Sequence, residues 1–275
     1  MTEAERRRRL KKELDGLYRR FDRSMVSPDP LECVPVRGEF RDIELSAFLA
    51  AVFAYGKANL IVRNVRSILS ELGPHPHRAL MGGKYKTKFR HFKYRFHKRP
   101  DLIWLLDRLR VIYKKYGSVE NAFCAVPGTL ETRLKNFARL FYGNGKQRAA
   151  AQSFLIPSPD GGSACKRMNL FLRWMVRHDD VDLGLWKKLA PAELVIPLDV
   201  HVNRIAGRIG LVNPAGTANF KKARELTERL KTFNAADPVR YDFALCSLGK
   251  LGHCAKQPEE KSCRICGLAP LCSKT

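Results

Sequence analysis

The sequence predicts an all-α protein, and three observations support this fold class. Apolar residues recur three and four positions apart through most of the chain, which is the spacing of an amphipathic helix. Proline and glycine separate the periodic segments, as they do where helices end. No run of alternating polar and apolar residues indicates a strand, and no internal repeat is present. With 275 residues, the chain can bury a substantial core in one large domain or two smaller ones.

The expected helices follow in chain order from this spacing. Three apolar stripes in the first half each fit one face of a helix, namely Leu45, Phe48, Leu49, Val52 and Phe53; Ile61, Val65, Ile68, Leu69 and Leu72; and Leu102, Leu105, Leu106, Leu109 and Tyr113. Further helices are expected at residues 130–142, 163–177, 199–209, 220–230 and 239–245.

Charge indicates the class of partner. Lysine and arginine number 51 against 27 acidic residues, a formal net charge of +24. Cations that neutralise phosphates release condensed counterions, so the balance favours a nucleic-acid partner. The charged start of the chain has no apolar segment behind it, and the longest apolar stretch, residues 45–55, is too short to cross a bilayer. We therefore expect a soluble, cytoplasmic protein without a membrane partner. The basic run at residues 6–9 fits either a DNA-contacting arm or a solvated helix face.

An aromatic and basic stretch occupies residues 82–100, "GGKYKTKFRHFKYRFHKRP". Its five aromatic residues alternate with lysines and arginines. The aromatics can stack on an unpaired base while the cations follow the phosphates. They can equally be core residues whose charged neighbours form a solvated face. Spacing leaves both interpretations open.

The four C-terminal cysteines are predicted to bind a metal. They read C, eight residues, C, two residues, C, five residues, C, at Cys254, Cys263, Cys266 and Cys272. In a reducing cytosol such a cluster indicates metal ligands rather than disulfides. Four thiolates suit a [4Fe-4S] cluster or a tetrahedral zinc, and their spacing does not choose between them. The other cysteines, Cys33, Cys124, Cys165 and Cys246, are expected to pack as small apolar residues.

The segment "PSPDGGSACKRMNLFLRWMVR" is a candidate anion site. Gly161 and Gly162 lead into a helix expected to begin near Ser163, whose free N–H groups would point outward. Lys166, Asn169 and Arg173 then share one helical face. A lysine in this position is either a phosphate-binding or solvated charge or, if buried and partly deprotonated, a nucleophile.

A second helix start is expected at "VIPLDVHVNRI". Pro197 ends the preceding segment, and Asp199 can cap the helix that follows. Asp199 alone indicates a structural cap more strongly than a catalytic group. His201, one turn into the helix, is expected to support the site or lie at the surface rather than bind a metal.

Together, these segments resemble the helix-hairpin-helix DNA glycosylase superfamily, which includes endonuclease III and the adenine and 8-oxoguanine glycosylases. "GSACKRMN" looks like the second helix of the hairpin with its catalytic lysine, "PLDVHVNRI" like the helix-capping aspartate segment, and the terminal cysteines, with "HCAKQP" just before the second of them, like the iron-sulfur loop. "LFLRWMVRHDDVDLGLW", "IPLDVHVNRI" and "DPVRYDFALCSLG" look more closely like an uncharacterised bacterial family distantly related to those enzymes. The resemblance covers residues 42–272.

The resemblance implies a two-lobed helix-hairpin-helix fold that holds DNA between its lobes. Residues 42–190 would form the lobe with the hairpin, and residues 1–41 with 191–275 the other lobe, which carries the cysteine loop. It implies that Lys166 forms the Schiff base, that Asp199 is the essential carboxylate and that the cysteines hold the cluster. DNA would contact the residues of the hairpin and of the capped helix, Gly161, Gly162, Ser163, Asn169, Arg173, His201 and Arg204.

The implied function is a base-excision DNA glycosylase with abasic-site lyase activity on oxidised bases. It would act as a nucleoid-associated monomer on double-stranded DNA that contains a damaged base. "SPDGGSA" replaces the usual hairpin turn, and Lys166 and Asp199 stand 33 positions apart. That interval resembles the archaeal 8-oxoguanine branch and favours 8-oxoguanine slightly, while the long first cysteine gap adds weight to zinc. The alternatives are a non-catalytic DNA-binding protein of the same fold and, for the cysteine loop, a zinc module for protein contacts.

Overall fold

The all-α fold class is confirmed. The computed structural model describes residues 1–142, 150–257 and 259–273. Within these residues the chain is mostly helical, and the helices are α1 (Glu3–Arg20), α2 (Phe40–Val52), α3 (Ala58–Leu72), α4 (Pro76–Gly82), α5 (Arg99–Tyr116), α6 (Val119–Cys124), α7 (Leu130–Tyr142), α8 (Ala150–Leu155), α9 (Lys166–Val176), α10 (Val200–Arg208), α11 (Phe220–Lys231), α12 (Asp242–Lys250) and α13 (Glu260–Arg264). No described helix is long and apolar enough to cross a membrane.

One short hairpin departs from the expected absence of strands. Strand β1 (Lys93–Tyr94) pairs antiparallel with β2 (His97–Lys98). The hairpin lies inside the aromatic and basic stretch, and a strand of two residues is too short to produce a readable alternation of polar and apolar side chains. Periodicity over a long window therefore could not have found it.

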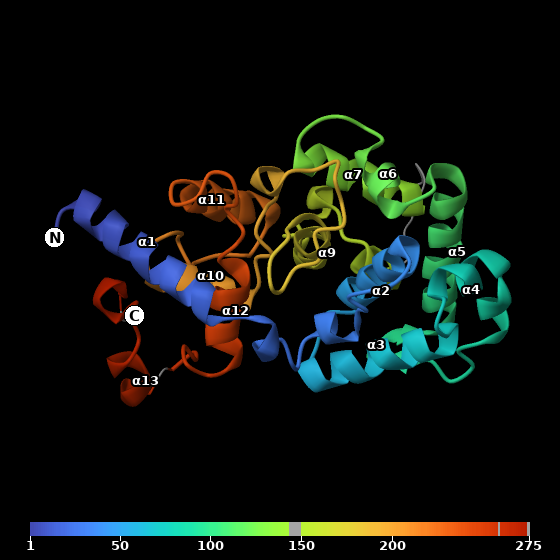
Figure 1. The fold of residues 1–275 in the computed structure, drawn as a ribbon, viewed down its shortest axis with the longest axis horizontal. Coiled ribbons are helices and arrows are strands. Elements are labelled where there is room, and N and C mark those ends of the chain that lie inside the picture. Colours follow the sequence, from blue (N-terminus) through green and yellow to red (C-terminus); the bar gives the residue numbers. More distant parts are fainter. Residues whose placement is uncertain (143–149, 258, 274–275) are drawn as a thin grey trace.

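Helix α9 lies at the centre of the molecule (Figure 1). Helices α2 to α7 gather on one side of it, and α1 and α10 to α13 gather on the other. Helix α2 packs against α9, and α10 packs against α12. Buried residues on both sides of α9 belong to one continuous apolar cluster. The first residue of α9 is therefore held by the packing of the whole core.

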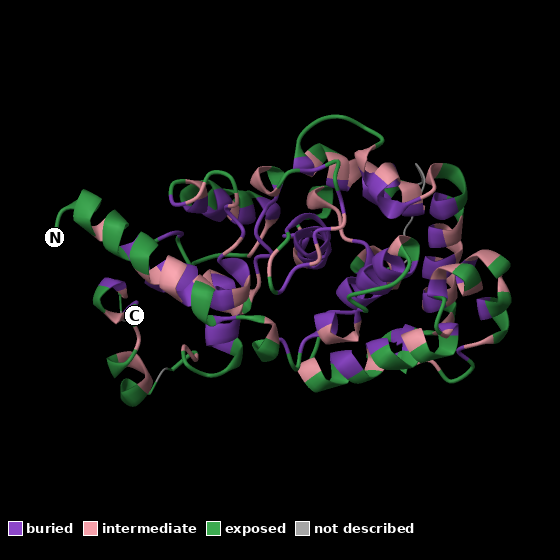
Figure 2. Ribbon diagram, in the orientation of Figure 1, coloured by how far each residue is buried: buried purple, intermediate pink, exposed green. Residues whose placement is uncertain are grey.

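Helices α2 and α9 are buried on nearly all sides (Figure 2). Every residue of α9 after Lys166 is buried, including two arginines and an asparagine. A helix surrounded by protein must pair its polar side chains internally, because unpaired polar groups cost free energy away from water. The predicted amphipathic face of residues 163–177 is thus wrong in one respect, since α9 has no solvent face beyond its first residue.

Four ionic side chains form a buried network that joins α9 to α12. Arg173 Nε lies 3.1 Å from Asp182 Oδ1, and the Arg173 guanidinium also donates to Asp242 on α12. Arg177, at the end of α9, donates to the other oxygen of Asp182. The Arg173 and Arg177 side chains are 4% and 3% exposed, and that of Asp182 is 0% exposed. These charges fix α9 relative to α12, the two helices that carry opposite sides of the candidate site.

The basic N-terminal helix is docked rather than free. Leu10, Leu14 and Leu17 of α1 are buried, and α1 packs against α12. Arg6 donates through Nη2 to the carbonyl of Ile209 at 2.9 Å and to that of Leu271 at 3.0 Å. Residues 6–9 were expected to form either a DNA-contacting arm or a solvated helix face. Arg6 does neither, because it ties α1 to the end of α10 and to the C-terminal segment.

Candidate active site and cysteine cavity

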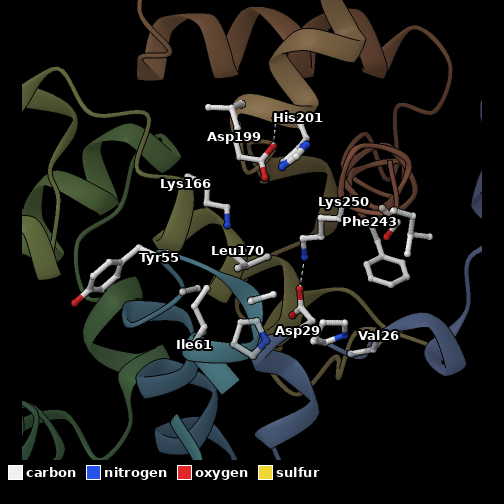
Figure 3. A pocket seen from close by; sticks show the side chains of 18 of the residues that line it. Val26, Asp29, Tyr55, Ile61, Lys166, Leu170, Asp199, His201, Phe243 and Lys250 are labelled. Carbon is white, nitrogen blue, oxygen red and sulfur yellow. Dashed lines mark hydrogen bonds and ion pairs between the residues drawn. The ribbon is translucent and has the colours of Figure 1, made fainter. Parts of the chain in front are cut away.

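A cavity of about 600 Å³ lies where five segments of the chain meet. Its walls come from the loop at residues 25–30, the turn between α2 and α3, the start of α9, the start of α10 and the end of α12. Figure 3 shows the amines of Lys166 and Lys250 and the carboxylate of Asp199 pointing into it, and the Tyr55 hydroxyl pointing away. Mostly apolar clefts with a few converging polar groups are the usual form of ligand sites, and we call this cavity the central pocket.

Lys166 and Asp199 both line the central pocket. Lys166 is the first residue of α9, and Asp199 is the N-cap of α10. Figure 3 shows the Lys166 amine and the Asp199 carboxylate on the same side of the pocket. Within the described residues no ion pair engages the Lys166 amine. The fold therefore brings together the two residues that sequence analysis singled out as catalytic.

The carboxylate of Asp199 is held from both sides. Its Oδ1 accepts from the backbone N–H groups of His201 at 2.9 Å and Val202 at 2.8 Å, so the predicted N-cap is confirmed. Its Oδ2 accepts from the Cys246 thiol at 3.3 Å. Burial alone would raise the pKa of Asp199, but the Lys166 charge and these hydrogen bonds outweigh it, so the pKa lies below its ordinary value. Asp199 is therefore an anion beside the Lys166 amine at neutral pH.

A second amine in the central pocket is held in an ion pair. Lys250 Nζ lies 2.6 Å from Asp29 Oδ2, and Figure 3 shows this pair away from Lys166. Burial would lower the pKa of Lys250, but the Asp29 carboxylate outweighs burial and the pKa is raised. Lys250 is thus kept protonated by its ion pair with Asp29.

The turn that precedes α9 is tighter than expected. Gly161 ends a 3-10 turn, and Gly162 follows with φ of 72°. Ser163 Oγ accepts from the Cys165 N–H at 3.0 Å, and Cys165 adopts a left-handed φ of 51°. Helix α9 begins only at Lys166, not near Ser163. The correction matters because it makes Lys166 the first helical residue, where its side chain can leave the helix and enter the pocket.

Two predicted DNA-contacting residues are buried. Asn169 is 1% exposed and donates through Nδ2 to the carbonyl of Ala164 at 3.2 Å. Arg173 is 3% exposed and belongs to the ionic network described above. Both share a face with Lys166, as the spacing indicated, but that face turns into the core. The prediction that they contact DNA is therefore wrong for this structure.

His201 and Arg204 connect the central pocket to the cysteine segment. His201 lines the pocket, and its pKa is lowered by burial in spite of the nearby Asp199, so the ring is neutral at physiological pH. Arg204 Nη2 lies 3.2 Å from His201 Nδ1 and donates to the carbonyl of Cys254 at 2.7 Å. A Cβ on Gly249 of α12 would lie 2.5 Å from His201 Nδ1, so only glycine permits this close approach of α10 and α12.

Sequence reasoning missed three polar residues of the site, Cys246, Lys250 and Asp29. Cys246 and Lys250 are four positions apart on α12 and so share one helical face. That spacing indicates that the two side chains share a face, but nothing in the sequence indicates that the face lies against Asp199. Asp29 lies in a loop far away in sequence, and no local pattern marks it. Cys246, expected to pack as a small apolar residue, instead donates to the candidate catalytic carboxylate.

The family model described as protein of unknown function (DUF2400) matches residues 29–251. The chain belongs to that family. No curated protein and no solved structure matches it. The DUF2400 region begins at Asp29 and ends just after Lys250, so it includes both members of that ion pair together with Lys166 and Asp199.

The four C-terminal cysteines follow the DUF2400 region and line a second cavity, of about 330 Å³. Its remaining wall is largely apolar, with Ile205 of α10, Ile209 just after that helix and Leu248 of α12. Arg208 Nη1 lies 3.0 Å from Cys254 Sγ. Burial raises the pKa of Cys272, and the other three cysteines raise it further, because gathered thiolates repel one another. We call this space the cysteine cavity.

The cysteine cavity brings together the four thiols that sequence analysis assigned to a metal group. All four thiols are free, and the cavity exceeds by several times the roughly 30 Å³ that one water molecule occupies. Among the described residues, no three potential ligands are gathered closely enough to hold a single ion. Arg208, His253 and Glu260 are the charged or polar residues of the cavity wall besides the cysteines, and Arg208 donates to Cys254 Sγ.

Proposed function

We propose that the protein is a DNA glycosylase with associated abasic-site lyase activity. The observation that carries this proposal is the convergence of Lys166 and Asp199, 33 positions apart in sequence, on one pocket. The net charge of +24 supplies affinity for the DNA backbone. The resemblance of both segments to the helix-hairpin-helix glycosylases, with the two-lobed arrangement that it implies, agrees with this chemistry.

In the proposed reaction the damaged nucleotide leaves the duplex and enters the central pocket, because its glycosidic bond cannot be reached in the stack. The Lys166 amine bonds to C1′ of the sugar, and the base departs with the electron pair of the glycosidic bond and takes up a proton. Ring opening and loss of the amine proton give an imine. Removal of a proton from C2′ then expels the 3′-phosphate and cuts the strand.

Asp199 has two roles in this scheme. Its anionic carboxylate stabilises positive charge on the sugar as the base departs, and it can take the proton that the attacking amine releases. Lys250 is the weaker candidate, because its Nζ is paired with Asp29 Oδ2 at 2.6 Å, whereas no ion pair engages the Lys166 amine within the described residues. This difference in pairing supports Lys166 as the nucleophile.

Among damaged bases we propose oxidised purines, with 8-oxoguanine as the first substrate to try. Asp29 and Lys250 present an acceptor beside a donor, near the ring of Phe243 (Figure 3). An 8-oxopurine carries a hydrogen on N7 next to the O8 acceptor, so its edge complements this pair. Unmodified guanine presents an acceptor at N7 and would face the Asp29 carboxylate unfavourably.

We further propose that the four cysteines hold a [4Fe-4S] cluster, which would order the C-terminal segment against α10 and α12. Anaerobically purified protein should contain about four iron atoms per chain and absorb visible light. Cys263→Ser should lose most of that iron, whereas Cys124→Ser, outside the cysteine cavity, should keep it. A colourless protein with about one zinc per chain would show that the cysteines hold a tetrahedral zinc and not a cluster.

The role of Asp199 can be separated from its capping role by Asp199→Asn. Asparagine caps helices about as well as aspartate, so the fold should persist while the charge is lost. We expect the single-turnover rate on 8-oxoguanine DNA to fall by roughly 10²–10⁴-fold. Because the pKa of Asp199 lies below its ordinary value, the wild-type carboxylate is ionised from about pH 5 upward.

The factor by which Asp199→Asn lowers the single-turnover rate should therefore be the same from about pH 5 to pH 9. Thermal unfolding of the variant checks that it is folded. A loss that disappears toward low pH would mean that Asp199 is already protonated there. A rate equal to that of the wild type would remove Asp199 from the mechanism.

The runner-up function is DNA binding without catalysis, which the charge of the chain supports independently of the pocket. It predicts salt-dependent binding to duplex DNA with a slope set by the phosphates neutralised, and no strand cleavage on any lesion. A panel of lesions assayed for both binding and cleavage separates the two functions.

A further inference from the structure

The aromatic and basic stretch at residues 82–100 splits into buried and exposed parts. Tyr85, Phe89 and Tyr94 are buried in the core, and Phe92 is half-buried. Phe96 differs, with 50% of its surface exposed. Of the two interpretations of this stretch, the core interpretation therefore holds for most of its aromatics, and Phe96 remains to be explained.

Phe96 lies at the tip of the β-hairpin. Lys93 pairs with Lys98 and Tyr94 with His97, which leaves Arg95 and Phe96 as the two-residue turn. Arg95 has a φ of 54°, as the first turn residue of such a tight hairpin requires. The chain thus adopts an unfavourable backbone conformation at a non-glycine residue in order to present an arginine and a phenylalanine at a narrow tip.

The hairpin is fixed to the rim of the central pocket. The Tyr94 hydroxyl donates to the carbonyl of Tyr55, and the Tyr55 hydroxyl lies 2.6 Å from His97 Nδ1. A Cβ on Gly56 would lie 3.1 Å from the Tyr94 hydroxyl and 3.3 Å from Arg95 Nη1. Tyr55 and Gly56 both line the central pocket. The position of the tip relative to Lys166 is therefore set by direct contacts.

Phe96 belongs to an open aromatic cluster beside the pocket. Its ring centroid lies 4.9 Å from that of Phe154, which is 40% exposed, and 6.1 Å from that of Tyr55. The Arg167 guanidinium covers the Phe154 ring at 4.4 Å from its centroid. Four exposed cations lie in the tip or within six residues of Phe96 in sequence, namely Arg90, Lys93, Arg95 and Lys98.

We propose that this hairpin tip inserts into duplex DNA beside the extruded nucleotide and that Phe96 fills the gap left in the stack. Extrusion unstacks a base step at a cost in free energy, and an inserted apolar side chain offsets that cost. The cations around the tip suit phosphates, whereas a protein partner would have to match an aromatic surrounded by like charges. This inference rests on the proposed function, since it takes the ligand of the pocket to be DNA.

The test measures binding of the full-length protein with Lys166→Ala to two duplexes, one with a tetrahydrofuran abasic analogue and one intact. No chemistry can occur on this analogue, so the result does not depend on lyase activity. We expect a preference for the abasic duplex that Phe96→Ala lowers by about tenfold, that Phe96→Trp retains and that Val111→Ala, an exposed apolar residue on α5, leaves unchanged. Stacking should also quench the emission of the indole that Phe96→Trp introduces.

The charge around the tip gives a second readout. Lys98→Gln should weaken binding to both duplexes alike and reduce the salt slope by roughly one phosphate contact. An abasic preference that is unchanged in Phe96→Ala overturns the proposal, and so does an absence of any abasic preference in the parent protein. If the lyase assay fails but the abasic preference depends on Phe96, the proposed chemistry is contradicted and the role of Phe96 in DNA binding is supported.

Discussion

Lys166→Ala is expected to abolish covalent trapping on DNA. With wild-type protein, borohydride should reduce the imine formed with abasic-site DNA and leave a stable adduct on a denaturing gel. Alanine removes the amine that is proposed to form that bond, so the adduct should vanish rather than weaken. The change is small for the fold, because Lys166 is the first residue of α9 and its amine makes no ion pair within the described chain.

Lys250→Met is the matched control for Lys166→Ala. It removes a second lysine from the same pocket, but one whose amine Asp29 holds in the protonated state. Trapping on abasic-site DNA should persist, since no base needs to be recognised there, whereas trapping on 8-oxoguanine DNA should decrease. An adduct that forms with Lys166→Ala and is lost in Lys250→Met would show that Lys250, and not Lys166, is the nucleophile.

The largest effect on stability is expected from Asp182→Ala. Its carboxylate lies between Arg173 and Arg177 at the centre of the fold, with 0% of the side chain exposed. Alanine at this position removes the carboxylate that neutralises part of the charge of both buried guanidinium groups. The two groups then repel each other more strongly. Breaking a buried pair in this way costs about 3–5 kcal/mol, a large fraction of the roughly 5–15 kcal/mol by which domains are stable.

Denaturant unfolding gives the measurement, with the fluorescence of the buried Trp174 and Trp186 as the probe. Asp180→Ala is the control, because it removes an exposed carboxylate two positions away and should change the free energy of unfolding by less than about 0.5 kcal/mol. Equal midpoints for the two variants would show that the buried network contributes little to stability.

Helix α9 illustrates how far sequence patterns reach. Its spacing correctly predicted a helix and the common face of Lys166, Asn169 and Arg173. Periodicity reports which residues share a face, but not whether another helix covers the polar side. Here the carboxylate of Asp182, just beyond the end of α9, and that of Asp242, on the distant helix α12, pair with Arg173 and turn the apparent DNA-binding face into part of the core.

The sequence by itself determined the helical class, the cap formed by Asp199 and the positive charge, because these depend on composition and on neighbours within one turn. It also singled out the cysteines that line one cavity. Only the tertiary structure decided that Lys166 lies near Asp199 while Lys250 is paired with Asp29. It also decided that Phe96, unlike the other aromatics of its stretch, is exposed over 50% of its surface. Those outcomes depend on packing between segments far apart in the chain, and no local pattern encodes which segments will meet.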